Sequence, residues 1–388
     1  MNILIVSRVL PHHSIGGMQV VAWDLACALA KQQHKVSVLT AEVPGKGNFF
    51  RSEDVDVHCM KGLHWSRYGR EWRNAVLRHC TAEVLAPYDV ILGVSAGAAP
   101  LLSMKGSIPA KIIMQAHGTS MGEVLSKWRS RHLLEIAKSV KNIIGVFKNL
   151  LMFPRYDSII SIGSAVTEDF GRYPLSLLGG RVSVVQINNG VSVVDFTLPA
   201  SNRVEVRREL DWTGDQRIVI TACRLDRQKG VDLSLRAFER AYRDNADLRY
   251  LVIGDGPERK RLESAAANMG LSSVVKFLGS VQRRDVARYL GASDIMLFST
   301  TRVEGLPMNI LEALAAGLPC LVSGHVVSKQ PICDSVIPID PHDFDGVAAR
   351  INDLRVAPLN KKQSLLPEEF TLDYSARAYV DHFRLVSN

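Results

Sequence analysis

Short apolar segments alternate with helical stretches along this chain, and that alternation limits the possible folds more than any other feature. Residues 2–7 (NILIVS) and 35–40 (KVSVLT) have the composition of buried strands, and residues 17–33 between them carry Ala and Leu at helical spacing. Further strands are predicted at 89–94, 111–116 and 158–162. Strands that alternate with helices indicate a parallel sheet, with ligand sites at the carboxyl ends of its strands. The predicted fold class is therefore α/β.

The alternation resumes in the second half of the chain. Strands are predicted at 218–225, 250–257, 274–279, 294–299 and 319–323, and helices at 231–242, 258–269 and 307–316. Single cores seldom grow past about 250 to 300 residues, so 388 residues suit two domains. An Asn-Gly turn followed by polar and charged residues at 189–214 indicates the crossing between them. The predicted domains are 1–195 and 196–371, followed by a terminal helix at 372–388.

The excess positive charge of the chain lies in its first half. Residues 1–190 hold 21 Lys and Arg against 13 Asp and Glu, whereas residues 191–388 hold 26 of each. This asymmetry suggests that the first half meets an anionic partner, such as a membrane face or a charged acceptor. Six cysteines without a C-x-x-C pair are typical of reduced, mostly buried thiols in a cytosolic protein. No apolar run reaches the roughly 18 residues of a membrane span, and the opening residues lack a secretory signal.

Residues 299–317 (STTRVEGLPMNILEALAAG) combine two acids with the start of a helix. Glu304 and Glu312 stand on either side of Pro307, which opens the predicted helix, and Gly317 closes it. The free amides and the dipole of a helix start can seat a phosphate, and Glu312 lies about 7.5 Å further along the axis. Each carboxylate can accept two hydroxyl hydrogen bonds. A surface loop followed by an ordinary helix would give the same spacing.

Two further motifs follow strands. Arg224 and Lys229, in RLDRQKG, can both reach one diphosphate from the carboxyl end of a strand, although solvated loop charges are the simpler interpretation. Gly16-Gly17 opens the first helix, where glycine lets a ligand approach the backbone, but it lacks the G-x-G-x-x-G pattern and also suits a tight turn. No Walker loop is present.

Other candidate residues have weaker signals. His117 ends the strand at 111–116, where a ligand would lie, although a lone histidine there is usually structural. Asp343 and Asp345 beside His342 look like metal ligands, but the proline-rich turn favours a helix cap, and we predict no metal site.

Two basic stretches lie in the first half. Residues 61–79 interleave arginines with Trp65, Tyr68 and Trp72, which suits either an anionic lipid surface or an ordinary surface helix. Residues 127–152 mix Lys and Arg with apolar residues at helical spacing, and a core-packed helix is the favoured interpretation there.

In combination, these motifs resemble those of the retaining glycosyltransferases of family 4. The resemblance covers nearly the whole chain and rests on the Gly-Gly loop, the His-Gly strand end, INNGVSVVDF at 187–196, R-L-x-x-x-K-G, GDGP at 254–257 and the two acids of E-x7-E. It implies the GT-B fold, with two Rossmann-like parallel-sheet domains facing across a cleft. The first domain would bind the acceptor and the second the nucleotide sugar, and the terminal helix would cross back onto the first.

The resemblance also implies residue roles. Arg224 and Lys229 would hold the donor diphosphate with backbone amides, Glu312 would bind ribose hydroxyls, Glu304 would contact the transferred sugar, and His117 would lie beside that sugar. The catalytic residues implied are His117, Arg224, Lys229 and Glu304. The donor-binding residues implied are Gly16, Gly17, Arg224, Lys229, Gly254, Gly279, Val281, Glu304, Gly305, Leu306, Pro307, Met308 and Glu312.

The reaction implied is transfer of a hexose or N-acetylhexosamine from a UDP- or GDP-linked sugar, with no cofactor and no metal. Paired cations and helix amides would stabilise the charge that develops on the leaving phosphate. The expected acceptor is a lipid-linked glycan or a cell-envelope polysaccharide precursor, handled in the cytoplasm or peripherally at the inner membrane face. The alternatives are a sugar-nucleotide epimerase of the same fold, a transferase acting on a small soluble acceptor, and a non-catalytic binding module. Arg302 departs from the family pattern and leaves the sugar open, and no nucleic-acid-binding pattern appears.

Overall fold

The structure is a computed structural model that describes residues 1–13, 17–65, 67–122, 124, 140–213, 215–302, 307–327, 332–355, 357–358 and 362–387. The chain divides into two compact units. The first unit contains residues 1–190 and 372–388, and the second contains residues 191–371. The division falls slightly before residue 195, because the Val191 amide already donates a hydrogen bond to the Phe370 carbonyl (2.9 Å) within the second unit.

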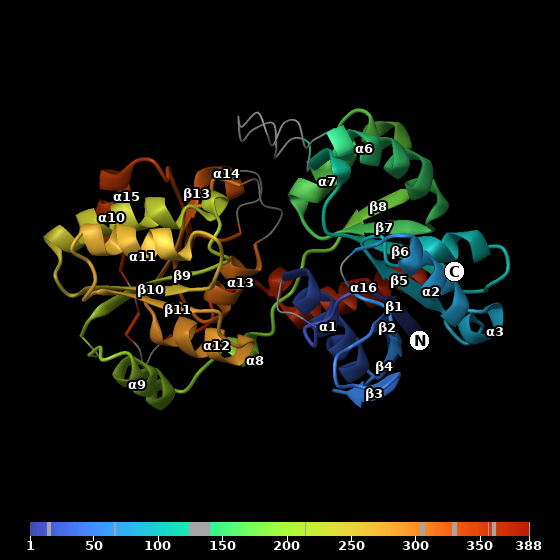
Figure 1. Ribbon diagram of the computed structural model, residues 1–388, viewed down its shortest axis with the longest axis horizontal. Coiled ribbons are helices and arrows are strands. Elements are labelled where there is room, and N and C mark those ends of the chain that lie inside the picture. The colour runs from blue at the N-terminus through green and yellow to red at the C-terminus, as the bar shows by residue number, and fades with distance from the viewer. Residues whose placement is uncertain are drawn as a thin grey trace. The chain divides into compact units, whose positions relative to one another are not determined.

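A parallel sheet forms the centre of the first unit (Figure 1). Among the described residues it has eight strands in the order β3-β4-β2-β1-β5-β6-β7-β8, and only β3 runs antiparallel to its neighbour. The strands are β1 (Asn2–Val6), β2 (Lys35–Ala41), β3 (Phe49–Ser52), β4 (Val55–Met60), β5 (Val90–Val94), β6 (Lys111–Ala116), β7 (Ser158–Ser161) and β8 (Ser183–Gln186). The central strands are almost continuously apolar, as expected of a parallel sheet that is covered on both faces.

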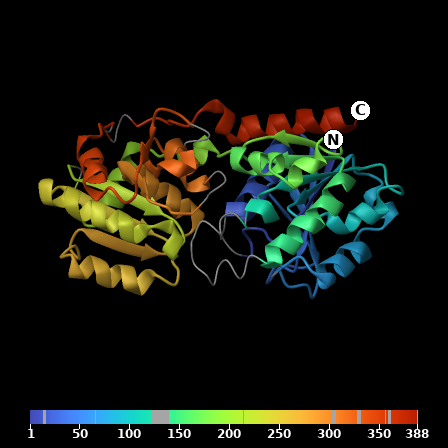
Figure 2. The same cartoon turned by 90° about the horizontal axis from the view of Figure 1, so that it is seen from above.

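Helices cover each face of this sheet and bury a separate core against it. The helices are α1 (Gly17–Lys31), α2 (Arg70–His79), α3 (Ala82–Leu85), α6 (Val140–Met152), α7 (Ser164–Gly171) and α16 (Leu372–Ser387), with single turns η1 (Ala99–Met104), η2 (Phe153–Arg155) and η3 (Leu175–Leu178). One core contains Trp72 and Phe153, and the other contains Trp23, Tyr379 and Phe383. The last two residues come from α16, so the end of the chain completes the first unit (Figure 2).

The second unit contains a six-stranded parallel sheet, counted over the residues that are described. Its order is β11-β10-β9-β12-β13-β14, from β9 (Arg217–Ala222), β10 (Leu248–Ile253), β11 (Val275–Gly279), β12 (Ile295–Phe298), β13 (Cys320–Ser323) and β14 (Val336–Ile339). Numbered within the unit, this is the Rossmann order 3-2-1-4-5-6. The strand order reverses between β9 and β12, so a ligand crevice is expected at the carboxyl ends of these two strands.

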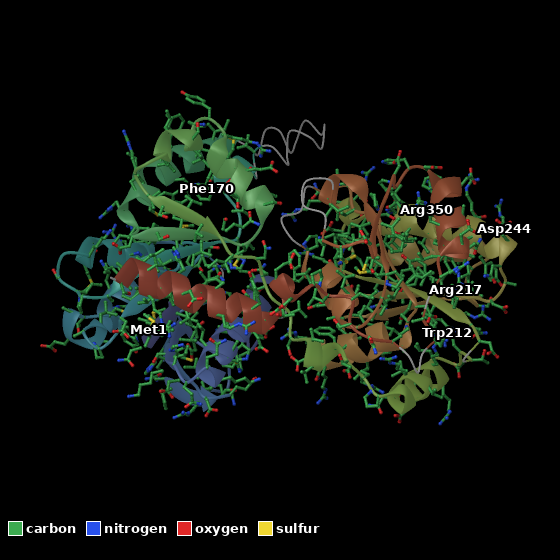
Figure 3. All side chains as sticks on the ribbon, turned by 180° about the vertical axis from the view of Figure 1, so that it is seen from behind. Met1, Phe170, Trp212, Arg217, Asp244 and Arg350 are labelled. Atoms are coloured by element: carbon green, nitrogen blue, oxygen red, sulfur yellow. The ribbon has the colours of Figure 1, made fainter. Side chains whose placement is uncertain are left out.

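The helices of the second unit connect these strands on both faces. They are α8 (Val193–Phe196), α9 (Ala200–Glu209), α10 (Val231–Asp244), α11 (Arg259–Asn268), α12 (Arg283–Ala292), α13 (Met308–Ala315), α14 (Gly324–Val327) and α15 (Phe344–Asp353), with turns η4 (Arg227–Lys229) and η6 (Glu368–Phe370). Arg217, at the start of β9, donates to the Ile351 and Asn352 carbonyls (both 2.9 Å) at the end of α15 (Figure 3).

The predicted crossing at 189–214 is more ordered than its polar composition suggested. It contains α8 and α9, and Arg207 of α9 is only 2% exposed. Arg207 Nη2 donates to Asp294 Oδ2 (2.7 Å), which also accepts from the Ile218 amide (2.8 Å). Lys362 Nζ lies 3.4 Å from Asp294 Oδ1. A buried ion-pair network therefore holds α9 to the start of β9, and the stretch contains the crossing between the two units, as predicted.

The first basic stretch, residues 61–79, contains a surface helix. Trp72 is buried and donates to the Gly97 carbonyl (2.9 Å), and Tyr68 donates to the Val94 carbonyl (2.8 Å). Arg70 and Arg73 are exposed, so α2 has a charged outer face and a packed inner face, which fits the ordinary surface helix among the two alternatives.

The second basic stretch, residues 127–152, was expected to form a core-packed helix. Residues 127–139 lie outside the described residues, and residues 140–152 form α6. Val146 of α6 is buried in the core, as the interpretation expected, whereas Phe147 and Leu151 on its outer face are 62% and 79% exposed. No helix in the described part of the chain has the length and apolar composition needed to cross a bilayer.

Candidate functional site

Two loops meet at the reversal point of the second sheet. One follows β9 and contains Arg224 and Lys229, and the other follows β12. The Gln228 carbonyl accepts from the Thr301 amide (2.8 Å) and from Thr300 Oγ1 (3.0 Å), so the two loops are hydrogen-bonded to each other. The R-L-x-x-x-K-G motif is therefore held against the residues that precede Glu304.

Gly230 permits this contact between the two loops. Its φ is +67°, and a Cβ built on it would lie 1.9 Å from the Ser299 carbonyl oxygen. Only glycine combines a left-handed backbone with such a close approach. Ser234 Oγ donates to Ser299 Oγ (2.9 Å), which fixes the first turn of α10 to the end of β12.

The GDGP motif packs the end of β10 against the same loop. The Leu225 amide donates to the Asp255 carbonyl (2.9 Å), and the Gly254 amide donates to the Gly279 carbonyl at the end of β11 (2.8 Å). A Cβ on Gly254 would lie 1.8 Å from the Cys223 carbonyl oxygen. Gly254 is therefore needed for packing between two loops, and Gly279 lies beside it. Val281, two residues further on, packs against the core.

The two predicted phosphate-binding cations have different surroundings. Arg224 is exposed, whereas Lys229 is half-buried with its Nζ 5.4 Å from the centre of the Phe298 ring, in a cation–π contact. Asp226 accepts from the Gln228 amide (3.1 Å) and so caps the turn that carries Lys229. The lysine is thus placed at the end of β12 by its own turn and by the ring beneath it.

Helix α13 begins at the same edge of the sheet. Pro307 is its N-cap instead of its first helical residue, and Gly317 follows its end with a φ of +79°. Asn309 Nδ2 donates to the Ala222 carbonyl (3.0 Å), which fixes the start of α13 to the end of β9. Sequence reasoning missed Asn309, although an asparagine in the first turn of the predicted helix was a visible signal.

Most of the second-domain residues in the predicted site lie on the elements that meet at this edge. They are Arg224, Lys229, Gly254, Gly279, Pro307, Met308 and the half-buried Glu312. Glu304, Gly305 and Leu306 lie outside the described residues, as does Gly16. Arg302 is described, and its carbonyl accepts from His325 Nε2 (2.9 Å).

The first unit has its own reversal point, between β1 and β5. Gly17 begins α1, the helix after β1. Gly97 lies in the loop after β5 and approaches the end of β1, where a Cβ on Gly97 would lie 2.0 Å from the Val6 carbonyl oxygen. Ser95, in the same loop, has a φ of +53°, which is uncommon for a residue with a side chain. Sequence reasoning missed this loop, whose signal is the glycine of S-A-G-A-A-P.

His117 follows β6, which lies on the other side of β5. Its Nε2 donates to Gln115 Oε1 (2.8 Å), and Gln115 Nε2 donates to the Tyr379 hydroxyl of α16 (2.8 Å). Gln115 and Tyr379 are both 1% exposed. Burial lowers the pKa of His117 to about 4, so its imidazole is neutral at neutral pH with Nδ1 as an acceptor. Sequence reasoning missed Gln115 and Tyr379, because their partners are far away in sequence.

The loop after His117 is fixed by a second polar cluster. Thr119 Oγ1 donates to Asp169 Oδ2 (2.7 Å) and accepts from the Gly122 amide (2.9 Å). Arg172 Nη1 donates to Asp169 Oδ1 (2.6 Å). Burial raises the pKa of Asp169, while the bonds from Thr119 and Arg172 oppose that rise.

The residues that resembled metal ligands form a cap. Asp343 Oδ1 accepts from the Gly346 amide (3.0 Å) at the start of α15, and Asp345 pairs with Arg240 (2.6 Å), so the cap interpretation is confirmed. Within the described ranges no group of three or more His, Cys, Asp or Glu side chains could hold a metal ion. None of the six cysteines, all of which are described, forms a disulfide, and four of them are buried.

The two Rossmann-like units and the motif order define a GT-B glycosyltransferase, and two family models match the chain in turn. Residues 15–193 match "Glycosyltransferase Family 4", and residues 202–364 match "Glycosyl transferases group 1". Together these matches cover most of the sequence. The chain therefore belongs to the glycosyltransferases of family 4.

Individual relatives are distant. A glycosyltransferase of Salmonella typhimurium named for colanic acid biosynthesis is 24% identical over 68% of this chain and 61% of its own length. The chain thus matches less than two thirds of that relative. A GDP-mannose-dependent monoacylated alpha-(1-6)-phosphatidylinositol monomannoside mannosyltransferase of Corynebacterium glutamicum is 25% identical over 73% of this chain and 72% of its length.

Solved structures share the fold over the full length. A sucrose-phosphate synthase from Thermosynechococcus elongatus superposes with a TM-score of 0.73 at 18% identity, covering 99% of this chain and 98% of its own. The Anabaena protein HepE in complex with UDP gives a TM-score of 0.71 at 17% identity, covering 99% of this chain and 100% of its own. These likenesses support the GT-B fold that the sequence predicted.

Proposed function

We propose that this protein transfers a hexose or an N-acetylhexosamine from a UDP- or GDP-linked sugar to a lipid-linked glycan or a cell-envelope polysaccharide precursor. The donor diphosphate binds beside the loop after β9, where Arg224 and Lys229 supply positive charge and the start of α13 supplies backbone amides. The main support is the Gln228 carbonyl, which accepts hydrogen bonds from Thr300 and Thr301 and so ties this loop to residues that shortly precede the acid motif in the sequence.

The chemistry follows from the charges of these groups. When the glycosidic bond to the nucleoside diphosphate breaks, negative charge develops on the β-phosphate oxygen. Cations and helix amides that are already in place stabilise that charge without reorganisation. Glu304 contacts a hydroxyl of the transferred sugar, Glu312 binds the ribose, and the neutral His117 accepts a hydrogen bond from the sugar at Nδ1. The acceptor hydroxyl attacks on the same face of the sugar from which the diphosphate leaves, and its proton passes to the departing β-phosphate oxygen, so the anomeric configuration is retained.

Relatives support the choice of acceptor. One is named for a mannosyltransferase acting on a phosphatidylinositol mannoside, and another is an alpha-monoglucosyldiacylglycerol synthase of Acholeplasma laidlawii. The excess positive charge of the first 190 residues fits an acceptor held at an anionic surface. We therefore place the enzyme in the cytoplasm, acting peripherally at the inner face of the membrane.

A ligand screen tests the donor site. UDP, GDP and their sugars are added in turn, and the ligand that binds the native state raises the melting temperature. Lys229→Ala is expected to abolish that shift and most transfer, whereas Arg227→Ala removes one charge from the same turn and should preserve both. Glu304→Ala should remove most transfer. If the Lys229 and Arg227 variants lost the melting shift and the transfer activity equally, the total positive charge of the turn, and not a contact of Lys229 with the diphosphate, would cause nucleotide binding.

A further inference from the structure

A group of large apolar side chains is exposed on one side of the first unit. We call it the α6 patch, and it consists of Ile143, Ile144, Phe147 and Leu151 of α6 together with Tyr173, which precedes η3, and Leu177, which lies in η3. Helix α6 packs against η3, so the two elements are neighbours. Figure 1 shows α6 beside α7, the helix that leads into this turn.

The side chains of the patch form a continuous stripe along α6. Ile143, Phe147 and Leu151 are spaced four residues apart, so they advance by only about 40° per step around the helix. Ile144 and Phe147 are 54% and 62% exposed, and Leu151 is 79% exposed. Val146, about 100° around the helix from Phe147, is buried in the core. The helix therefore presents one apolar face to the protein and a second one to solvent.

Described cations accompany this exposed face. Lys148 lies on α6 next to Phe147, Arg155 follows the helix, and Arg181 follows η3, and all three side chains are exposed. The described acids nearby are already neutralised, because Asp157 pairs with Lys105 (2.9 Å) and Glu168 pairs with Arg172 (3.1 Å).

We propose that the α6 patch docks this enzyme on an anionic lipid bilayer. An amphipathic helix with cations along its border lies in the plane of the interface, with its apolar side chains inserted roughly 5–10 Å. Tyr173 suits this position because its ring is apolar and its hydroxyl can remain in water. Bilayer binding by the patch does not depend on the proposed function. Only its purpose, which is to bring the enzyme to a lipid-linked acceptor, rests on that function.

Co-sedimentation of the full chain with vesicles tests this proposal. The parent protein should sediment with vesicles of equal phosphatidylcholine and phosphatidylglycerol, and much less with phosphatidylcholine alone. The double variant Phe147→Ser and Leu151→Ser should lower the partition coefficient by at least about tenfold, because two side chains no longer enter the acyl boundary. Both side chains are largely exposed, so the fold should be retained, which circular dichroism checks.

A matched control uses the same substitutions elsewhere in the same unit. Phe49 and Leu385 are 55% and 74% exposed, close to the values for Phe147 and Leu151. Phe49→Ser with Leu385→Ser should change vesicle binding by less than about twofold, since the net charge and the loss of apolar surface are matched. Equal losses in the two double variants, or parental binding by the patch variant, would overturn the proposal.

Two further measurements complete the test. Self-association without vesicles shows whether the patch is an interface between copies of the chain, and the nucleotide-induced melting shift shows whether the donor site is intact in the patch variant. If the parent protein self-associates without vesicles and the patch variant becomes monomeric, the patch is an interface between copies and the bilayer proposal fails. The nucleotide-induced rise in melting temperature should be the same in parent and patch variant. A protein that binds vesicles but no sugar nucleotide would refute the proposed function while leaving the docking surface intact.

Discussion

Substitution of Gly230 offers the most informative test of how the donor site is built. In Gly230→Ala the new Cβ would start 1.9 Å from the Ser299 carbonyl oxygen, whereas Cβ contacts shorter than 3.0 Å are essentially never seen. The two loops must therefore separate by about 1 Å at this point, and a misplacement of about 1 Å can cost a hundredfold in activity. Because Lys229 precedes Gly230, the separation would move the cation away from its place beside Phe298.

Gly270→Ala is the matched control for this substitution. Gly270 has a φ of +73°, close to the +67° of Gly230, but a Cβ there would have nothing within 4 Å. Each alanine is strained by about 1–2 kcal/mol in the left-handed region, so that cost cancels between the two variants. The difference that remains reports the close approach to Ser299.

Urea denaturation and nucleotide titration measure that difference. Gly270→Ala should lose about 1 kcal/mol of unfolding free energy and keep parental nucleotide affinity. Gly230→Ala should lose about 3 kcal/mol or more, and its nucleotide affinity should fall by at least about tenfold. If the two variants were equally stable and bound nucleotide equally well, the argument that Gly230 joins the two loops would be refuted.

Three further predictions concern groups outside that contact. Asp294→Asn should cost about 3 kcal/mol or more in urea denaturation, because Arg207 and Lys362 would lose the buried carboxylate between them; a loss below about 1 kcal/mol would contradict this. Burial lowers the pKa of Lys362 from 10.5 to about 8. Between pH 8 and 10.5 the unfolded state therefore binds more protons than the folded state, and the free energy of unfolding should rise with pH by about 3 kcal/mol in total. Lys362→Met should remove that rise, and an unchanged pH profile of unfolding would show that the lysine does not cause it. Tyr379→Phe should raise the KM for the sugar nucleotide without changing the affinity for the free nucleoside diphosphate, because it breaks the hydrogen bonds through Gln115 that orient His117. If the KM and the nucleoside diphosphate affinity changed equally, a general loss of structure would be the cause.

The strands and helices of this protein were largely predictable from local pattern. The strand at 111–116 has the bounds that the sequence indicated, and the helix predicted at 307–316 is observed as Met308–Ala315. Apolar runs of strand length and helix-terminating glycines act over a few residues, so one-dimensional reasoning finds them. The order of the motifs also identified the family.

Sequence reasoning was less successful wherever a charged or aromatic residue found a distant partner. Arg207 gave no sequence signal of burial within the polar crossing, and it is buried against Asp294. Trp72 suited either a lipid surface or an ordinary surface helix, and only the structure shows that it donates to the Gly97 carbonyl in the core. Conversely, Phe147 was assigned to a packed helix and is 62% exposed. The sequence gives the type of each side chain, but only the tertiary structure determines whether that side chain is buried or exposed.

The sequence by itself determined the α/β class, the family and the candidate donor-binding residues, because these depend on periodicity and on short motifs. Only the tertiary structure decided the strand order that places the ends of β9 and β12 side by side, and the contacts of Gln228 and Gly230 that join their loops. It also decided that Tyr379, from the last helix, holds Gln115 beside His117. The physical reason is that hydrogen bonds and close packing act over a few ångströms in space, whatever the separation along the chain.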